Sequence, residues 1–374
     1  MYFDPKPKKS LADLFGRDEE VSHLIKVIKE KNPLIVISGL RRVGKTSLLG
    51  AVLNEKFEHI IWIDPRDFGS STLSKKEILR LFQNSIDIFL KSQRSKAETI
   101  IGFLKHIRGF SFYGVSIQFN AESEIDLKEL FAGLDRWATQ NGTSVILAID
   151  EAQDFAKSTE YALDVLLAGI YDKCSNNIII ILTGSEMGLL FNFLGDKDPT
   201  KPLYGRTRED IKLKPLTDKL SKQFLIEGFK QKGVDPRKDA ATIAAVNSAV
   251  KKLDGIVGWL IKFAKKCLSN GKIDEEYILE TQIEGSKQAR QEFEKFSRLQ
   301  VKEEAYFTIM KELLRLQTTS QIEFIEKFVE NGSTKNEVQE LLNEQFIVKI
   351  EEKYFIGDPL LQFSFEQEVN HADE

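Results

Sequence analysis

The chain carries an eight-residue pattern whose spacing and flanks allow few folds. Residues 39–46 read GLRRVGKT, which fits the phosphate-loop pattern G-x-x-x-x-G-K-[ST]. The apolar, β-branched run 34–37 precedes the pattern and predicts a buried strand, and residues 47–53 predict the first turns of a helix. A strand that leads through a glycine loop into a helix is the context in which this pattern binds phosphate. The pattern therefore predicts an α/β nucleotide-binding fold.

Each fixed position of the pattern has a chemical reason. Gly39 and Gly44 allow backbone conformations that a Cβ atom would forbid, so the loop N–H groups can converge on phosphate oxygens. Lys45 is expected to reach the β- and γ-phosphates, and the Thr46 hydroxyl is expected to bind Mg²⁺. Two alternatives stay open for the arginines at 41 and 42, which either face phosphate or anchor the loop to the helical part of the chain.

A second signal lies at the end of the apolar run 145–149, where Asp150 and Glu151 follow. Parallel strands place their carboxyl ends at the nucleotide, so Asp150 could hold Mg²⁺ through its water shell and Glu151 could act as general base. The alternative, that two acids simply begin a loop, is disfavoured beside a phosphate loop. Ser185 follows the next strand, where it either orients the attacking water or belongs to a solvated turn.

Arg206 and Arg208 lie shortly before the helical part of the chain. An arginine at this junction could contact the γ-phosphate, in the same chain or in a neighbouring one. The alternative is a surface arginine or a structural salt bridge.

Composition limits the class of protein. The 374 residues are enough for about two or three domains, and 42% hydrophobic with 29% charged residues is ordinary for a globular chain. No apolar run approaches the ~20 residues that span a membrane, and residues 1–10 lack the apolar core of a secretory signal. Cys174 and Cys267 are far apart, which argues against a disulfide framework. We therefore expect a cytoplasmic protein with no membrane partner.

Hydrophobic periodicity divides the chain into three predicted domains: a core over 1–215, a helical lid over 216–299 and a C-terminal domain over 300–374. In the core, strands alternate with helices, which predicts a parallel sheet with helices on both faces, and a β-hairpin is inserted at about 109–120. Three helices and a hairpin predict a winged-helix fold for the C-terminal domain. The predicted core strands are 34–37, 60–64, 145–151 and 178–182, and the core helices begin near 18, 47, 75, 126 and 159. The predicted C-terminal elements are helices to about 316, at 321–329 and at 335–343, and strands at 346–350 and 353–356.

Charge bears on the partner. Residues 301–374 hold 7 Lys/Arg against 16 Asp/Glu, whereas residues 211–300 hold 18 against 12. The helix 334–344 that would enter a DNA groove carries one lysine against three glutamates, and phosphate contacts require Lys or Arg. We therefore expect the winged helix to bind protein rather than nucleic acid, and any DNA contact to come from the basic lid.

Four segments together resemble the archaeal ATPase family within the STAND branch of AAA+ P-loop proteins: FGRDEE at 15–20, GLRRVGKTS at 39–47, IDEAQ at 149–153 and LTGS at 182–185. The resemblance covers nearly the whole chain, and the chain is similar, more distantly, to origin-recognition and initiator ATPases. It implies ATP or ADP and Mg²⁺ as cofactors. The implied base-flanking residues are Phe15, Gly16 and Arg17, and the implied phosphate-loop residues are Gly39, Arg41, Arg42, Val43, Gly44, Lys45, Thr46 and Ser47. The implied metal ligands are Thr46 and Asp150, and the implied catalytic residues are Lys45, Glu151, Ser185 and Arg206.

Three functions are compatible with these observations. We favour an ATP-hydrolysing conformational switch that acts on an unidentified protein partner. The protein could also form an oligomer that depends on the bound nucleotide. The alternatives are a DNA-binding initiator or loader, and a nucleotide-binding scaffold without turnover. Glu151 argues against the scaffold, because a protein that does not hydrolyse ATP has no need of a general base.

Overall fold

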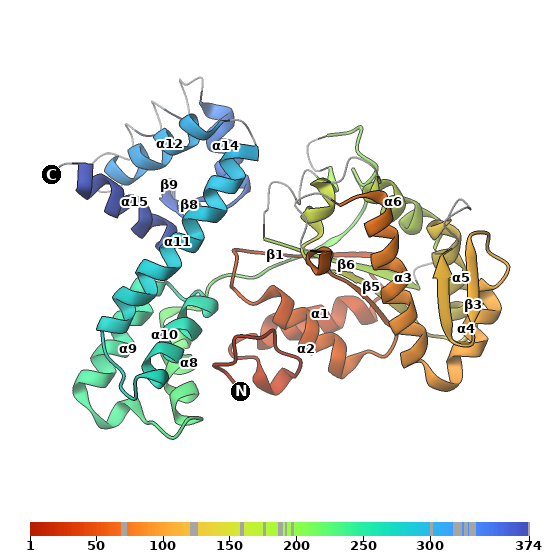
Figure 1. Cartoon of the computed structure of the whole chain (residues 1–374), viewed down its shortest axis with the longest axis horizontal. Helices are drawn as coiled ribbons and strands as arrows, with labels where there is room; N and C mark the ends of the chain where they lie inside the picture. Colours follow the sequence, from red (N-terminus) through yellow and green to blue (C-terminus); the bar gives the residue numbers. More distant parts are fainter. Residues whose placement is uncertain are drawn as a thin grey trace.

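The structure is a computed structural model with three parts: a sheet-containing core, a group of lid helices and a C-terminal region (Figure 1). It describes residues 1–68, 73–119, 126–157, 161–174, 177–185, 190, 193–195, 198–299, 302–316, 324, 328 and 334–372.

The core is built on a parallel sheet of five strands in the order β2-β5-β6-β1-β7. Every residue of β1, β5 and β6 is buried, as expected for strands covered on both faces. The predicted parallel sheet with flanking helices is therefore confirmed. The strands are β1 (Leu34–Ser38), β2 (Ile60–Ile63), β5 (Val145–Ile149), β6 (Ile178–Gly184) and β7 (Glu209–Lys212).

Side chains alternate between the two faces of the sheet. In β1, Leu34 and Val36 join the cluster formed with helices α3, α5 and α6, whereas Ile35 and Ile37 join the cluster formed with α1 and α2. The helices are α1 (Asp18–Lys29), α2 (Lys45–Lys56), α3 (Lys75–Ser92), α4 (Ala97–Leu104), α5 (Leu127–Gln140) and α6 (Leu163–Lys173).

The predicted hairpin is confirmed as β3 (Phe110–Tyr113) and β4 (Ser116–Phe119). It packs on α3, where the side chains of Asp87 and Gln83 accept hydrogen bonds from the backbone of β4 at 3.1 and 2.9 Å.

Two core elements were not predicted from the sequence, namely α4 and β7. β7 contains a single apolar residue, Ile211, and takes its place at the sheet edge through backbone pairing with β1. Because one neighbouring strand and one buried side chain suffice at an edge, β7 lacks the apolar run that marks the other strands. Helix α6 begins at Leu163, and the predicted start near 159 lies outside the described residues.

The region from about 217 to 298 is helical, as predicted. It comprises α8 (Asp218–Lys230), α9 (Ala240–Leu253), α10 (Val257–Ser269) and α11 (Glu276–Leu299). The C-terminal region comprises α12 (Glu303–Leu316), α14 (Lys335–Asn343), the hairpin of β8 (Ile347–Ile350) and β9 (Lys353–Ile356), and the unpredicted α15 (Pro359–Ala372). The predicted helix at 321–329 falls outside the described residues except for Phe324 and Phe328, so the winged-helix fold and the domain boundaries stay predictions.

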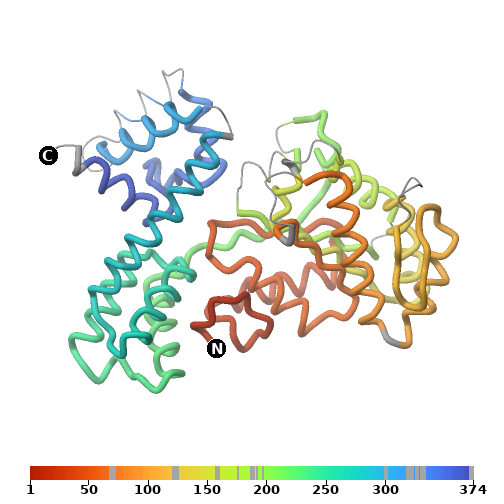
Figure 2. Tube along the Cα trace, in the orientation of Figure 1, coloured from red at the N-terminus to blue at the C-terminus, as the bar shows by residue number. Residues whose placement is uncertain are grey.

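One hydrophobic cluster runs through the lid and the C-terminal region. It also takes in Phe3 of the N-terminal arm (residues 1–10), whose ring lies 5.1 Å from the Phe229 ring of α8. Farther along the arm, the Lys8 N–H donates to the Ser47 hydroxyl of α2 at 3.1 Å. The arm, dark red in Figure 2, therefore bridges lid and core.

In the part of the chain that the structure describes, no helix has the length and apolar character needed to cross a membrane.

Candidate active site

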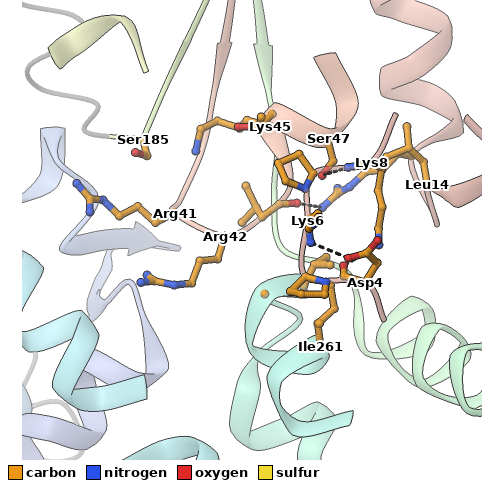
Figure 3. A pocket seen from close by; sticks show the side chains of 18 of the residues that line it. Asp4, Lys6, Lys8, Leu14, Arg41, Arg42, Lys45, Ser47, Ser185 and Ile261 are labelled. Atoms are coloured by element: carbon orange, nitrogen blue, oxygen red, sulfur yellow. Dashed lines mark hydrogen bonds between the residues drawn. The ribbon is translucent and has the colours of Figure 1, made fainter. Parts of the chain in front are cut away.

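A cavity of about 600 Å³ lies where the phosphate loop, the N-terminal arm and the lid meet (Figure 3). One end is polar and is lined by Lys45, Thr46, Arg66, Glu151 and Ser185. The other end (Figure 3) is lined by charged residues of the arm, among them Asp4, Lys6 and Lys8, and by a group of apolar side chains, namely Leu14, Phe15, Leu216, Phe224, Val257 and Ile261. A cavity that offers polar groups beside the phosphate loop and apolar, aromatic side chains farther away suits a nucleotide, whose phosphates and base differ in the same way.

Gly39 and Gly44, the two glycines of the phosphate-loop pattern, are required for different structural reasons. A Cβ atom at Gly39, where φ is +148°, would lie 2.3 Å from the Leu213 carbonyl oxygen, so only glycine lets the loop approach the strand exit so closely. At Gly44, where φ is +106°, a Cβ atom would meet nothing within 4 Å. Gly44 therefore borders open space at the start of α2, where backbone N–H groups can face an anion.

Lys45 is 4% exposed and donates to the carbonyl oxygens of Gly39 at 2.9 Å and Leu40 at 3.0 Å. Burial lowers the pKa of Lys45 to about 8, although the nearby carboxylates of Glu151 and Asp150 act in the opposite direction. Phosphate oxygens could replace these carbonyl contacts and would stabilise the charged amine.

The two predicted metal ligands lie together. The Thr46 hydroxyl is 2.9 Å from Asp150 Oδ2 and 3.2 Å from Oδ1, and the Thr183 hydroxyl also donates to Asp150. Asp150 is fully buried, and burial raises its pKa, although the hydrogen bonds and Arg66 oppose this shift. A hydroxyl and a carboxylate are hard oxygen donors of the kind that Mg²⁺ prefers, so the residues present fit this ion.

Glu151 is held by several donors in one orientation. Its Oε2 accepts from the Ser185 hydroxyl at 2.7 Å, the Ser185 N–H at 3.1 Å and the Gln153 amide at 2.7 Å. The residue has a φ of +49°, an unusual value for a non-glycine residue that fits a functional position. Burial alone would raise the pKa of Glu151, but the Lys45 ammonium and these hydrogen bonds lower it to about 2. Glu151 is therefore ionised at neutral pH.

The predicted base-flanking residues divide into two kinds. The Phe15 ring lies at the apolar end, 5.3 Å from Tyr2 and 5.7 Å from Phe224 between ring centroids. Arg17 is buried, and its guanidinium donates to the carbonyl oxygens of Lys214 at 2.8 Å and Val43 at 3.2 Å. Although Arg17 also lines the cavity, its contacts hold the phosphate loop to the segment that follows β7.

The loop arginines at 41 and 42 both line the cavity and both contact Glu292 of α11. The alternative in which they anchor the loop to the helical domain therefore describes this structure. Figure 3 shows the two side chains extending in the same direction, away from the arm residues Lys6 and Lys8.

Arg206 does not line the cavity. Its guanidinium pairs with Asp172 at the end of α6, at 2.6 Å, and lies over the Tyr171 ring. Arg208 likewise pairs with Asp210 at 3.0 Å. These are the structural salt bridges that the sequence left open as the alternative, and a role for Arg206 in a neighbouring subunit stays a prediction.

Arg66 and Glu292 are among the polar residues of the site that were not predicted from the sequence. Arg66, in the short helix that follows β2, contacts Asp150 and Asp64 and lies 3.9 Å from Glu151 Oε1. Arg66 could have been predicted, because it follows β2, and residues that follow parallel strands gather at the same edge of the sheet as Asp150 and Glu151 after β5. Glu292 had no such signal, since 250 residues separate it from Arg42.

Residues 14–263 match the model of an ATPase domain found predominantly in Archaea. This match spans more than half of the chain, and the chain therefore belongs to this archaeal ATPase family. The predicted archaeal ATPase family is confirmed, and the protein is a nucleotide-binding ATPase with the P-loop AAA+ fold. Its place in the STAND branch stays a prediction.

Solved structures give the same result. The Walker-type ATPase paby2304 of Pyrococcus abyssi is 29% identical, covers 98% of this chain and 100% of its own, and has a TM-score of 0.77. The ORC2 protein of Aeropyrum pernix, solved in ADPNP–ADP complexes, is 12% identical over 99% of this chain and 97% of its own, with a TM-score of 0.53, which is a likeness of fold alone. No curated protein sequence matches the chain.

Proposed function

We propose that this ATPase is a Mg²⁺-dependent conformational switch, in which ATP binding and hydrolysis change the position of the lid and the C-terminal region relative to the core. One observation carries the proposal: a single cavity is walled by the phosphate loop, by the arm and by lid residues of α8, α10 and α11. A ligand in this cavity contacts both parts, so its binding or its loss changes the balance of contacts that hold them in their present arrangement.

The residues at the polar end support hydrolysis. Thr46 and Asp150 would hold Mg²⁺, which when bound would neutralise charge on the β- and γ-phosphate oxygens. Glu151, held ionised by its donors, would accept the proton of the water that attacks the γ-phosphorus, while the bond from the γ-phosphorus to the β–γ bridging oxygen breaks. Lys45 would stabilise the phosphates.

Measurements of ATP hydrolysis test this assignment. We expect Lys45→Ala to lose nucleotide binding, and Glu151→Gln to bind ATP but to hydrolyse it at least about 100-fold more slowly. Glu98→Gln, an exposed change on α4 outside the cavity, is the control and should match the wild type. Equal activity in all four proteins would remove the assigned roles. A distance between core and C-terminal region that is identical with and without ATP would reject the switch.

A DNA-binding initiator or loader is the second candidate function. The sequence argued against it because the helix at 334–344 is acidic, but in the folded chain these acids are paired. The acids of α14 do not form an outward face, since Glu337 and Glu340 pair with Lys302 at 3.2 and 3.0 Å. The exposed positions of α14 are Lys335, Asn336 and Gln339, which provide one cation for phosphate contacts.

The basic lid is also partly neutralised. Lys262 pairs with Glu284 at 3.3 Å, and Lys266 pairs with Glu280 at 2.9 Å. We therefore favour a protein partner for this chain. A gel shift with duplex DNA that is strong at low salt and lost at high salt would reverse this preference.

A further inference from the structure

An ion pair joins the phosphate loop to the lid. The two carboxylate oxygens of Glu292 on α11 accept hydrogen bonds from the two terminal guanidinium nitrogens of Arg42, at 2.6 and 3.1 Å. Glu292 also lies 3.4 Å from the guanidinium of Arg41. The pair with Arg42 is bidentate, which is the stronger geometry for arginine and carboxylate. Glu292 and both arginines line the nucleotide cavity.

Further contacts fix Arg42 in this place. Its guanidinium lies over the ring of Trp259, 4.2 Å from the centroid, and its carbonyl oxygen accepts the Gly258 N–H at 3.0 Å. Both partners lie at the start of α10. The tip of the phosphate loop is therefore docked on two lid helices at once.

The turn of α11 that carries Glu292 also packs against the C-terminal region. Phe293 packs against Phe346 and Phe365, with ring centroids 5.0 and 5.6 Å apart, and Phe296 stacks on Tyr306 at 5.1 Å. Within five residues, α11 thus touches the phosphate loop on one side and the core of the C-terminal region on the other.

Bound phosphate would compete with Glu292 for the side chains of Arg41 and Arg42. A nucleotide brings several negative charges into a cavity that a carboxylate already lines, and arginine binds phosphate as readily as carboxylate. Arg41 is 37% exposed, makes the longer contact with Glu292 and acts electrostatically on Lys45, so it is the cation that a phosphate reaches more easily.

We propose that Glu292 is a positioning residue that competes with the phosphates of the nucleotide for the loop arginines, so that phosphate binding loosens α11 from the loop. The inference rests on the switch proposed above and names its transmitting contact. Because Phe293 and Phe296 move with Glu292, loosening the pair frees the C-terminal region to change position.

The first test is the affinity for ATP, ADP and adenosine, measured by calorimetry on the full chain. Competition with phosphate predicts that Glu292→Gln binds ATP about three- to tenfold more tightly than the wild type, ADP by a smaller factor and adenosine equally. Glu294→Gln is the matched control, because Glu294 lies on the same helix but pairs with Arg290. An unchanged or weaker affinity for ATP, or the same factor for all three ligands, overturns the proposal.

The second test is a distance between spin labels at Glu98→Cys on α4 and Lys353→Cys on β9, both exposed positions. The native Cys174 and Cys267 are buried and leave the labelling specific. We expect ATP but not adenosine to change the distance in the wild type, and Glu292→Gln to show part of the change without nucleotide.

The outcomes separate the two proposals. A wild-type distance that ATP leaves unchanged rejects the switch, and the affinity series still decides whether Glu292 competes with phosphate. A wild-type change with ATP that adenosine reproduces, or a Glu292→Gln protein that matches the free wild type, overturns the role of Glu292 in transmission.

Discussion

The guanidinium of Arg66 contacts the buried carboxylate of Asp150 at the place where the two predicted Mg²⁺ ligands meet. Arg66 also pairs with Asp64 at 2.7 Å, and the hydrogen bond to Asp64 and the Asp150 charge raise the pKa of Arg66, so it is always charged. A cation of the protein thus balances Asp150 in this structure, and a metal ion that binds there must compete with it.

The first prediction concerns that competition. In Arg66→Ala, Asp150 loses its cation, so we expect half-maximal ATPase activity at a Mg²⁺ concentration about threefold lower than in the wild type. Arg237→Ala is a suitable control, because Arg237 pairs with Asp235 two residues away at 2.8 Å, as Arg66 does with Asp64, but lies in the lid. A higher Mg²⁺ requirement in Arg66→Ala would instead show that Arg66 helps to bind the nucleotide.

The second prediction is a pH dependence of ATP affinity. Burial lowers the pKa of Lys45 to about 8, so the amine is charged below pH 8 and increasingly neutral above it. ATP binds the charged form, and binding above pH 8 therefore requires proton uptake. We expect the Kd for ATP to rise toward about tenfold per pH unit above pH 8 and to change little between pH 6.5 and 7.5. Calorimetry in two buffers of different ionisation enthalpy would detect the proton. The Lys45→Arg protein should lack this rise, and a wild type that also lacks it would contradict the shift.

The third prediction concerns the close approach at Gly39. Gly39→Ala would place a Cβ atom 2.3 Å from the Leu213 carbonyl oxygen, so the loop or the strand exit must move. We expect about 1–3 kcal/mol of lost stability and a loss of ATP affinity of at least about tenfold. Gly142→Ala, at a φ of +60° with open space around the Cβ position, should cost about 1 kcal/mol and leave affinity unchanged. Equal effects at the two glycines would refute the steric argument.

The fourth prediction concerns the N-terminal arm. Phe3 is 4% exposed, and its ring fills the space beside Gly228 of α8. We expect Phe3→Ala to lower the free energy of unfolding by about 3 kcal/mol, as for other buried phenylalanines, measured by denaturant unfolding. Tyr113→Ala, a 69% exposed aromatic, should change it by less than about 0.5 kcal/mol. A loss below 1 kcal/mol in Phe3→Ala would mean that the arm is not anchored in solution.

The catalytic core was largely readable from local patterns. The phosphate loop, Asp150 and Glu151 stand at the ends of apolar strands, and the lid helices have the 3.6-residue period of amphipathic helices. These signals lie within one strand or helix and its flanks, so no knowledge of distant contacts is required to detect them.

Other features of the site depend on contacts between remote segments. For Ser185 the sequence left open whether it orients the attacking water or belongs to a solvated turn, and in the folded chain it lines the cavity and donates to Glu151. Arg206 pairs with Asp172 outside the cavity. The edge strand β7 has a single apolar residue and exists because β1 offers it backbone hydrogen bonds. Such outcomes are set by which side chains meet after folding.

The order of residues along this chain determined the phosphate loop, the buried strands and the helices, because backbone preferences and hydrophobic periodicity act over a few neighbours. Only the tertiary structure decided that Glu292 meets Arg42, that Arg66 meets Asp150 and that the arm closes one wall of the cavity. Ion pairs between distant segments carry no periodic signal, since they require only that two charges be brought together when the hydrophobic clusters form.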